Sequence, residues 1–177
     1  DGEIFFGTES IASNSLIAAP SHTVVLAKIV DITNSNTDPD DSIITTGAMT
    51  FGQFAFRAAD HENSADGFNN VEITKLTFTV SAVNMEFTSG SFYIFNALNS
   101  GTIAECTESA TTGTITLTCD GLDAEDVSTF ISRGGTLNLS LHGTILNAQV
   151  SPGVSILQAS LQNLSNPGIT GTINWSD

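Results

Sequence analysis

The chain has 177 residues, enough for one domain with a sizeable core. Four Lys and Arg residues stand against 19 Asp and Glu residues, which gives a formal net charge of -15 and a pI near 4.1. This balance excludes the basic surfaces that bind nucleic acid or anionic lipid, so nucleic acid is not expected as a partner. Only 13% of the residues are charged, so the chain is acidic because it lacks cations.

The chain begins at Asp1 without an initiator Met, and we expect a terminus left by removal of an N-terminal signal. The most apolar stretch, from Val24 to Ile32, is interrupted by Lys28 and Asp31 and falls short of the roughly 18 residues that a membrane helix needs. These features predict an extracellular or cell-surface protein whose mature chain does not insert into a membrane.

The N-terminus carries a short, strongly apolar segment. Ile4, Phe5 and Phe6 lie within a predicted strand at residues 3–8. Left exposed, such a strand would promote aggregation, so something must cover it. Two alternatives remain open: it closes its own sheet, or it is donated to a neighbouring subunit. We divide the chain into this N-terminal strand and extension, residues 1–20, and a single β-domain, residues 21–177.

Alternating apolar and polar residues predict mostly strands, separated by Gly-, Pro-, Asp- and Asn-rich turns. The strands are expected at residues 3–8, 23–32, 47–58, 71–83, 84–88, 91–97, 102–107, 114–119, 135–149, 153–163 and 168–175. This pattern predicts an all-β, antiparallel, two-sheet β-sandwich of the jelly-roll or Greek-key type.

An acidic loop at residues 60–70 joins two of the predicted strands. Its oxygen-bearing side chains include Asp60, Glu62, Asn63 and Asp66, which are suitable ligands for calcium. Their spacing does not follow the EF-hand pattern. An ordinary solvated loop is the favoured interpretation, and a calcium site is the alternative. No other cofactor is expected.

The apolar face of the segment 71–80 changes sides near Lys75, which predicts either a bulge or a crossing between sheets. Leu137, Leu139 and Leu141 alternate with polar residues, as in a half-buried strand. The one helical candidate runs from about Leu122 to Ser132, where Asp123 could cap the first turn.

Cys106 and Cys119 lie symmetrically about the pair Thr112 and Gly113. A two-residue turn at this pair would set the cysteines opposite each other on antiparallel strands. We therefore expect a cross-strand disulfide, which would persist only in an oxidising compartment. The alternative is two buried free thiols.

No catalytic site is expected. His22, His61 and His142 are not accompanied by a nucleophile motif, and no pair of carboxylates is set apart from the turns. The strand phenylalanines are expected in the core; these are Phe51, Phe54, Phe56, Phe78, Phe87, Phe92 and Phe95. Trp175 and Tyr93 are candidate sugar platforms, although packing is the favoured role of Trp175.

Three Asn-Xaa-Ser sequons, at Asn138, Asn163 and Asn174, are glycosylation candidates. Glycosylation there requires exposed sites and a source that has the machinery.

An acidic, Lys-poor sandwich that begins AspGlyGluIlePhePheGly resembles subunits of bacterial or archaeal surface filaments assembled by donor-strand complementation, such as camelysin-type fibres and archaeal bundling pili. The resemblance implies a head-to-tail homopolymer without a catalytic site, with residues 3–8 as the donor strand. The alternative is a monomeric adhesion or carbohydrate-binding module, with calcium in the 60–70 loop and a glycan or cell-surface partner.

Overall fold

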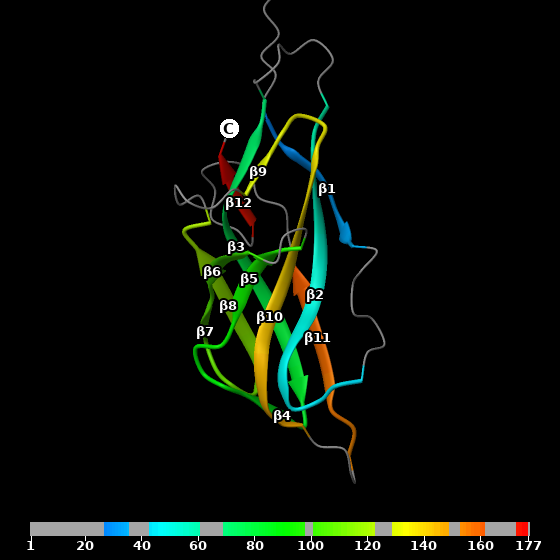
Figure 1. Ribbon diagram of the computed structural model, residues 1–177, viewed down its shortest axis with the longest axis vertical. Helices are drawn as coiled ribbons and strands as arrows, with labels where there is room; N and C mark the ends of the chain where they lie inside the picture. Colours follow the sequence, from blue (N-terminus) through cyan, green and yellow to red (C-terminus); the bar gives the residue numbers. More distant parts are fainter. Residues whose placement is uncertain are drawn as a thin grey trace, which may run out of the picture.

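A computed structural model describes residues 27–35, 43–60, 69–97, 101–122, 129–148, 153–161 and 173–176. These residues form two antiparallel sheets packed as a sandwich, with the long strands running along the long axis of the molecule (Figure 1). The predicted sandwich is therefore confirmed. The donor segment at residues 3–8 lies outside the described residues.

Sheet A is built around β10. Its strand order is β1-β2-β10-β5-β6, and β4 pairs with the same edge of β10 as β5, farther along that strand. The strands are β1 (Ile29–Asn34), β2 (Gly47–Ala58), β4 (Met85–Phe87), β5 (Tyr93–Asn96), β6 (Thr102–Glu105) and β10 (Thr136–Ala148).

Sheet B is built around β3. Its order is β11-β3-β8-β7, with β9 and β12 also paired to β3. The strands are β3 (Val71–Val83), β7 (Thr107–Glu108), β8 (Gly113–Asp120), β9 (Phe130–Ile131), β11 (Ile156–Leu161) and β12 (Ile173–Ser176).

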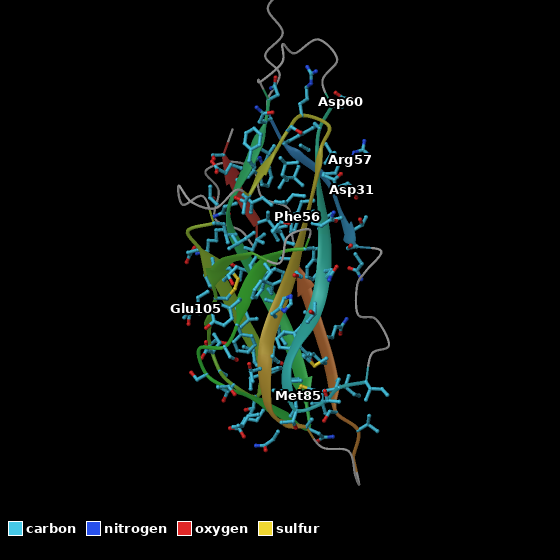
Figure 2. All side chains as sticks on the ribbon, in the orientation of Figure 1. Asp31, Phe56, Arg57, Asp60, Met85 and Glu105 are labelled. Carbon is cyan, nitrogen blue, oxygen red and sulfur yellow. A yellow bond between two sulfur atoms is a disulfide. The ribbon has the colours of Figure 1, made fainter. Side chains whose placement is uncertain are left out.

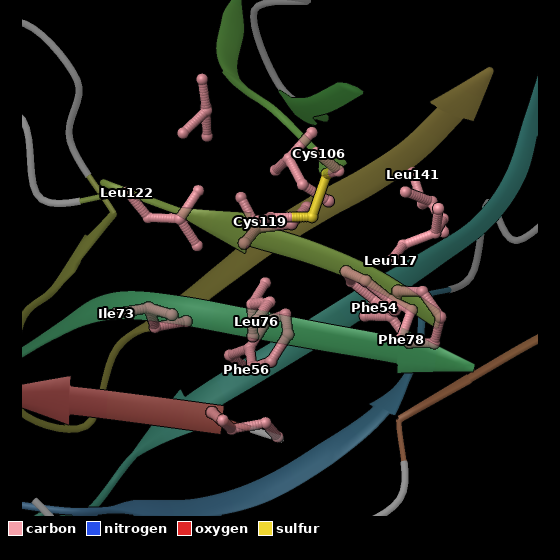
Figure 3. Close-up of a cluster of buried hydrophobic side chains, with 14 of the residues drawn as sticks. Phe54, Phe56, Ile73, Leu76, Phe78, Cys106, Leu117, Cys119, Leu122 and Leu141 are labelled. Atoms are coloured by element: carbon pink, nitrogen blue, oxygen red, sulfur yellow. A yellow bond between two sulfur atoms is a disulfide. The ribbon is translucent and has the colours of Figure 1, made fainter. Parts of the chain in front are cut away.

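The core fills the space between the sheets with aromatic and branched side chains (Figure 3). Phe51, Phe87 and Phe92 form one cluster with ring centroids 5.1 to 5.9 Å apart, in which Phe51 meets the other two rings edge to face. Gly143 is required beside it, because a Cβ there would lie 2.6 Å from the Phe51 ring. Trp175 is 4% exposed and belongs to the core, which confirms its predicted packing role.

The chain passes directly between the sheets at two corners. Asn84, with φ of 56°, separates β3 in sheet B from β4 in sheet A. Its side-chain amide donates to the Val154 carbonyl at 3.1 Å, and its own carbonyl accepts from the Ser155 hydroxyl at 2.8 Å. Cys106 separates β6 in sheet A from β7 in sheet B in the same way.

The change of face near Lys75 is a bulge rather than a crossing. Asn174 of β12 pairs with Lys75 and Trp175 pairs with Ile73, so Thr74 is the extra residue in β3. The chain crosses between the sheets nine residues after Lys75, at Asn84.

The predicted helix over residues 122–132 is wrong in its described part. Phe130 and Ile131 form β9, paired with Glu72 and Val71 of β3. The Thr129 hydroxyl donates to the carbonyls of Ile73 and Leu122, at 2.6 and 2.9 Å. Tertiary hydrogen bonds thus hold this segment extended, despite its helix-like apolar spacing.

Candidate functional site

One lateral side of the sandwich is closed covalently. Cys106 and Cys119 form a disulfide with their Cα atoms 4.2 Å apart, as the sequence predicted. The Cys106 N–H also donates to the Phe92 carbonyl at 2.8 Å, next to β5 of sheet A. The predicted two-residue turn is not formed, because Gly113 is already the first residue of β8 and pairs with Ala82 of β3. The connection between β7 and β8 is therefore longer than two residues.

A carboxylate ties the adjoining loop to the same side. Glu108 of β7 accepts from the Ser89 hydroxyl at 2.6 Å and from the Gly90 N–H at 3.0 Å. The Ser89 hydrogen bond is the main influence on the pKa of Glu108, and it lowers this pKa below its ordinary value. The core residues beneath, such as Ile103 and Leu117, are buried.

The opposite lateral side lies between β1 and β2 of sheet A and β11 of sheet B (Figure 1). Here apolar side chains pack against the core but stay partly exposed: Ile32, Ile44, Met49, Leu157, Ala159 and Leu161. In a complete two-sheet core such residues would be buried. We call this set of residues the open side.

The outward edge of β11 has backbone groups that no described strand pairs. The 4.2 Å Cα distance between Cys106 and Cys119 is typical of an antiparallel pair without mutual backbone hydrogen bonds. The backbone groups of Cys119 therefore point toward β3, where its register partner is Leu76. Along β3, successive residues point their backbone N–H and C=O groups alternately toward β8 and toward β11. Those of Thr79 point toward its partner Ser160 on β11.

Within β11 itself the same alternation continues. Leu157, Ala159 and Leu161 direct their backbone N–H and C=O groups away from β3, toward the outer edge.

A small aromatic cluster lies on the outer face of sheet A. Tyr93 and Phe95 of β5 are half-buried, and their ring centroids are 6.3 Å apart. The Phe95 ring lies 4.4 Å from the ring of His142 on β10. The prediction that Phe95 belongs to the core is therefore wrong, because strand alternation sends Ile94 inward and Phe95 outward. The other six strand phenylalanines are buried as predicted.

His142 is held by hydroxyl groups rather than by an acid. Its Nε2 lies 2.9 Å from the Ser140 hydroxyl and 3.3 Å from the Thr50 hydroxyl. Burial lowers the pKa of His142. Within the described ranges the imidazole contacts two hydroxyls and an aromatic ring, which is not a nucleophile–base–acid arrangement.

The acidic loop enters the described residues only at its two ends. Asp60 lies 3.8 Å from the Arg133 side chain. Glu62, Asn63 and Asp66 lie outside the described residues, as does His61. In the part of the chain that the structure describes, no three His, Cys, Asp or Glu side chains gather as a metal site. The calcium site remains a prediction.

The remaining predicted residues are distributed as follows. Asn138 is half-buried on β10 and Asn174 is half-buried on β12. Ile4, Phe5, Phe6, His22 and Asn163 lie outside the described residues. Over the described ranges, the fold contains no helix with the length and apolar character needed to cross a membrane.

Comparison of the chain with protein-family models, with curated proteins and with solved structures found no match.

Proposed function

We propose that this protein is the structural subunit of an extracellular homopolymeric filament, joined head to tail by β-strand addition of its N-terminal segment. The observation that carries the proposal is the open side. One lateral side of the sandwich is closed by a sheet crossing and a disulfide, whereas the other leaves apolar side chains such as Ile32, Met49 and Leu157 partly exposed. An added apolar strand would complete this core.

The composition of the chain supports the same function. Ile4, Phe5 and Phe6 supply an apolar strand of the kind the open side lacks. Donation from one subunit to the next is a heterologous contact, which produces an open filament rather than a closed dimer. The disulfide supports an extracellular location. We extend the proposal to the jelly-roll or Greek-key topology, since several strands adjacent in the sheets, such as β2 and β10, are distant in sequence.

Deletion of residues 1–8 tests this function. The expected product is a folded monomer, with the mass of one chain by light scattering and no filaments by negative-stain microscopy. A full-length variant with Ile4→Ser, Phe5→Ser and Phe6→Ser is the matched control for chain length and should behave alike. Filaments from either variant, equal in number to those of the unmodified chain, would refute the proposal.

A second function, binding of a glycan as an adhesion module, is favoured by the cluster of Tyr93, Phe95 and His142. Aromatic rings beside hydroxyl groups are common in sugar sites, because the rings contact apolar sugar faces and the hydroxyls hydrogen-bond. A glycan panel measured by thermal shift tests it, with Tyr93→Ala as the site variant and Phe130→Ala, an exposed aromatic on sheet B, as the control. If no glycan raises the melting temperature, or if Tyr93→Ala keeps every rise, this site is excluded.

Addition of calcium and of a chelator, measured in the same thermal shift format, tests the calcium alternative in the 60–70 loop. A rise in melting temperature with calcium that Asp60→Asn and Asp66→Asn remove would support it. An unchanged melting temperature would count against it.

A further inference from the structure

We infer that the outer edge of β11 is the acceptor for residues 3–8 of a second copy of this chain. This inference rests on the proposed function and assigns the donor a particular binding site. Three features of the described residues lead to it: the lack of edge protection on β11, the direction of its backbone groups, and the apolar side chains around it.

The other sheet edges carry features that discourage strand addition. Natural edge strands are protected by charges, bulges or shortness. β1 carries Asp31, labelled in Figure 2, and a register shift between Ile29 and Asp31. β4, β6 and β7 each contain a glutamate and have two to four residues. β9 has two residues, and β12 has four residues and a register shift.

β11 has none of these features. Its six residues are uncharged and pair with β3 in unbroken register from Ile156 to Leu161. The predicted donor strand at residues 3–8 has the same length. The donor also begins with a carboxylate, Glu3, and a second one, Asp1, precedes it. An uncharged edge accepts such a strand without the like-charge repulsion that Asp31 on β1 would cause.

At Leu157, Ala159 and Leu161 the backbone of β11 presents hydrogen-bonding groups that no described strand pairs. The side chains of these same residues face the core and are half-buried. A donor with Ile4 and Phe6 turned inward would extend this apolar row over the open side, while its backbone pairs with the three free positions.

The outward side of the donor then has a matching surface. Alternation places Phe5 on the outer face of sheet B, the face that also carries Ile156 and Val83. These two residues pair directly across β11 and β3, and they are 57% and 44% exposed. Phe5 would therefore lie on a face that already exposes aliphatic side chains to water.

The positions of the two segments favour exchange between copies. β1, which follows the donor segment, begins at one end of the sandwich, and β11 begins at the opposite end (Figure 1). A subunit stacked on the first would thus bring the start of its β11 close to the start of the first subunit's β1, the described strand nearest to the donor in the sequence. This arrangement repeats without limit along one axis.

Two full-length variants test the site together. Ala159→Pro removes a free N–H from the β11 edge but no hydrogen bond to β3, so the subunit should fold and polymerise at least about tenfold less. The donor variant carries Ile4→Ser and Phe6→Ser. Each variant alone should remain monomeric, and a mixture of the two should give discrete dimers, because each supplies the half that the other lacks.

Ile32→Pro is the matched control, since Ile32 has the same relation to the free edge of β1. If Ile32→Pro stops assembly and Ala159→Pro does not, the acceptor is β1 and the filament function stands. If the donor variant polymerises normally, the filament function itself fails. If the unmodified chain is monomeric and the donor substitutions only destabilise it, the strand closes its own sheet and the inference is overturned.

A crosslink keeps the test decisive if Ala159→Pro fails to fold. Gly7→Cys and Gln158→Cys place thiols on the same face of the neighbouring strands. Oxidised filaments of this double variant should give a covalent ladder of chains in denaturing electrophoresis without reductant. Gly7→Cys with Thr33→Cys on β1 should not, and the reverse result would contradict the assignment.

Discussion

Cys106 and Cys119 lie opposite each other at the place where the chain leaves one sheet and enters the other. The N–H of Cys106 donates to the carbonyl of Phe92, the residue before β5 of sheet A. Its sulfur is joined to Cys119 of β8 in sheet B (Figure 3). Cys106 therefore fixes the spacing of the sheets on the closed side of the sandwich.

Removal of this bond should lower the stability of the subunit. The cysteines are 13 residues apart, and closing a loop of this size is worth about 3 kcal/mol in the chain-entropy model. We expect Cys106→Ala with Cys119→Ala to lose about this much unfolding free energy in urea. The unmodified protein measured with a reductant is the control, and a loss below about 1 kcal/mol would contradict the expected role.

Gly143→Ala should be strongly destabilising. The new Cβ would lie 2.6 Å from two atoms of the Phe51 ring and 2.9 Å from Phe92, both of which are buried. Overpacking of this kind costs about 1 to 3 kcal/mol. Thr144→Ala on the outer face of the same strand should change the unfolding free energy little. Equal effects of the two substitutions would show that the core adapts easily.

Two substitutions of Trp175 separate the contribution of its packed ring from the cost of its buried N–H group. Its Nε1 is buried and has no hydrogen-bond partner among the described residues. Trp175→Ala should cost about 3 to 5 kcal/mol because it leaves a cavity. Trp175→Phe should cost clearly less, since it also removes a donor that is buried without a partner. Denaturant unfolding compares them, and a Phe variant as unstable as the Ala variant would contradict this account.

His142 should make the fold less stable as the pH falls. Burial lowers its pKa in the folded state, so the unfolded chain binds the proton more readily. Stability is therefore full above the unfolded pKa of about 6.5 and declines below it, until the folded pKa is passed.

The comparison with His142→Gln isolates this effect from His22 and His61. Unfolding free energies measured between about pH 7.5 and 5.5, above the range where most carboxylates titrate, should fall more for the unmodified protein. If the unfolding free energy falls equally with pH in both proteins, His142 does not cause the loss of stability.

High salt should preserve the filaments. Subunits with a net charge of -15 repel one another, and salt shortens the screening length from about 10 Å to about 3 Å between about 0.1 and about 1 M. Assembly held by apolar strands and backbone pairing should therefore be equal or faster at the higher concentration by light scattering. Filaments that dissolve in salt would indicate attraction between charges instead.

Much of the fold could be predicted because the long strands have unambiguous patterns. In β10, Leu137, Leu139 and Leu141 alternate with polar residues and are buried as expected. The cysteine pairing followed from symmetry alone. Both patterns lie within a short stretch of sequence, so they can be recognised without knowledge of tertiary contacts.

The errors occur where a distant contact decides the structure. Thr129 is held extended by carbonyls that include Ile73, 56 residues away, which no local apolar spacing reveals. Phe95 looks like a core residue by type, but the phase of a four-residue strand sends it outward. The unprotected edge of β11 is readable in the sequence as an uncharged run, yet only the sheet order shows that this run is an edge.

The position of Asn84 between the two sheets affects how a subunit would carry a pulling force. In the proposed filament, tension would enter a subunit through β11 in sheet B and leave through β1 in sheet A. The load must then cross from one sheet to the other. At Asn84 and at Cys106 that crossing is made of covalent bonds, so pulling would not simply slide the two sheets apart.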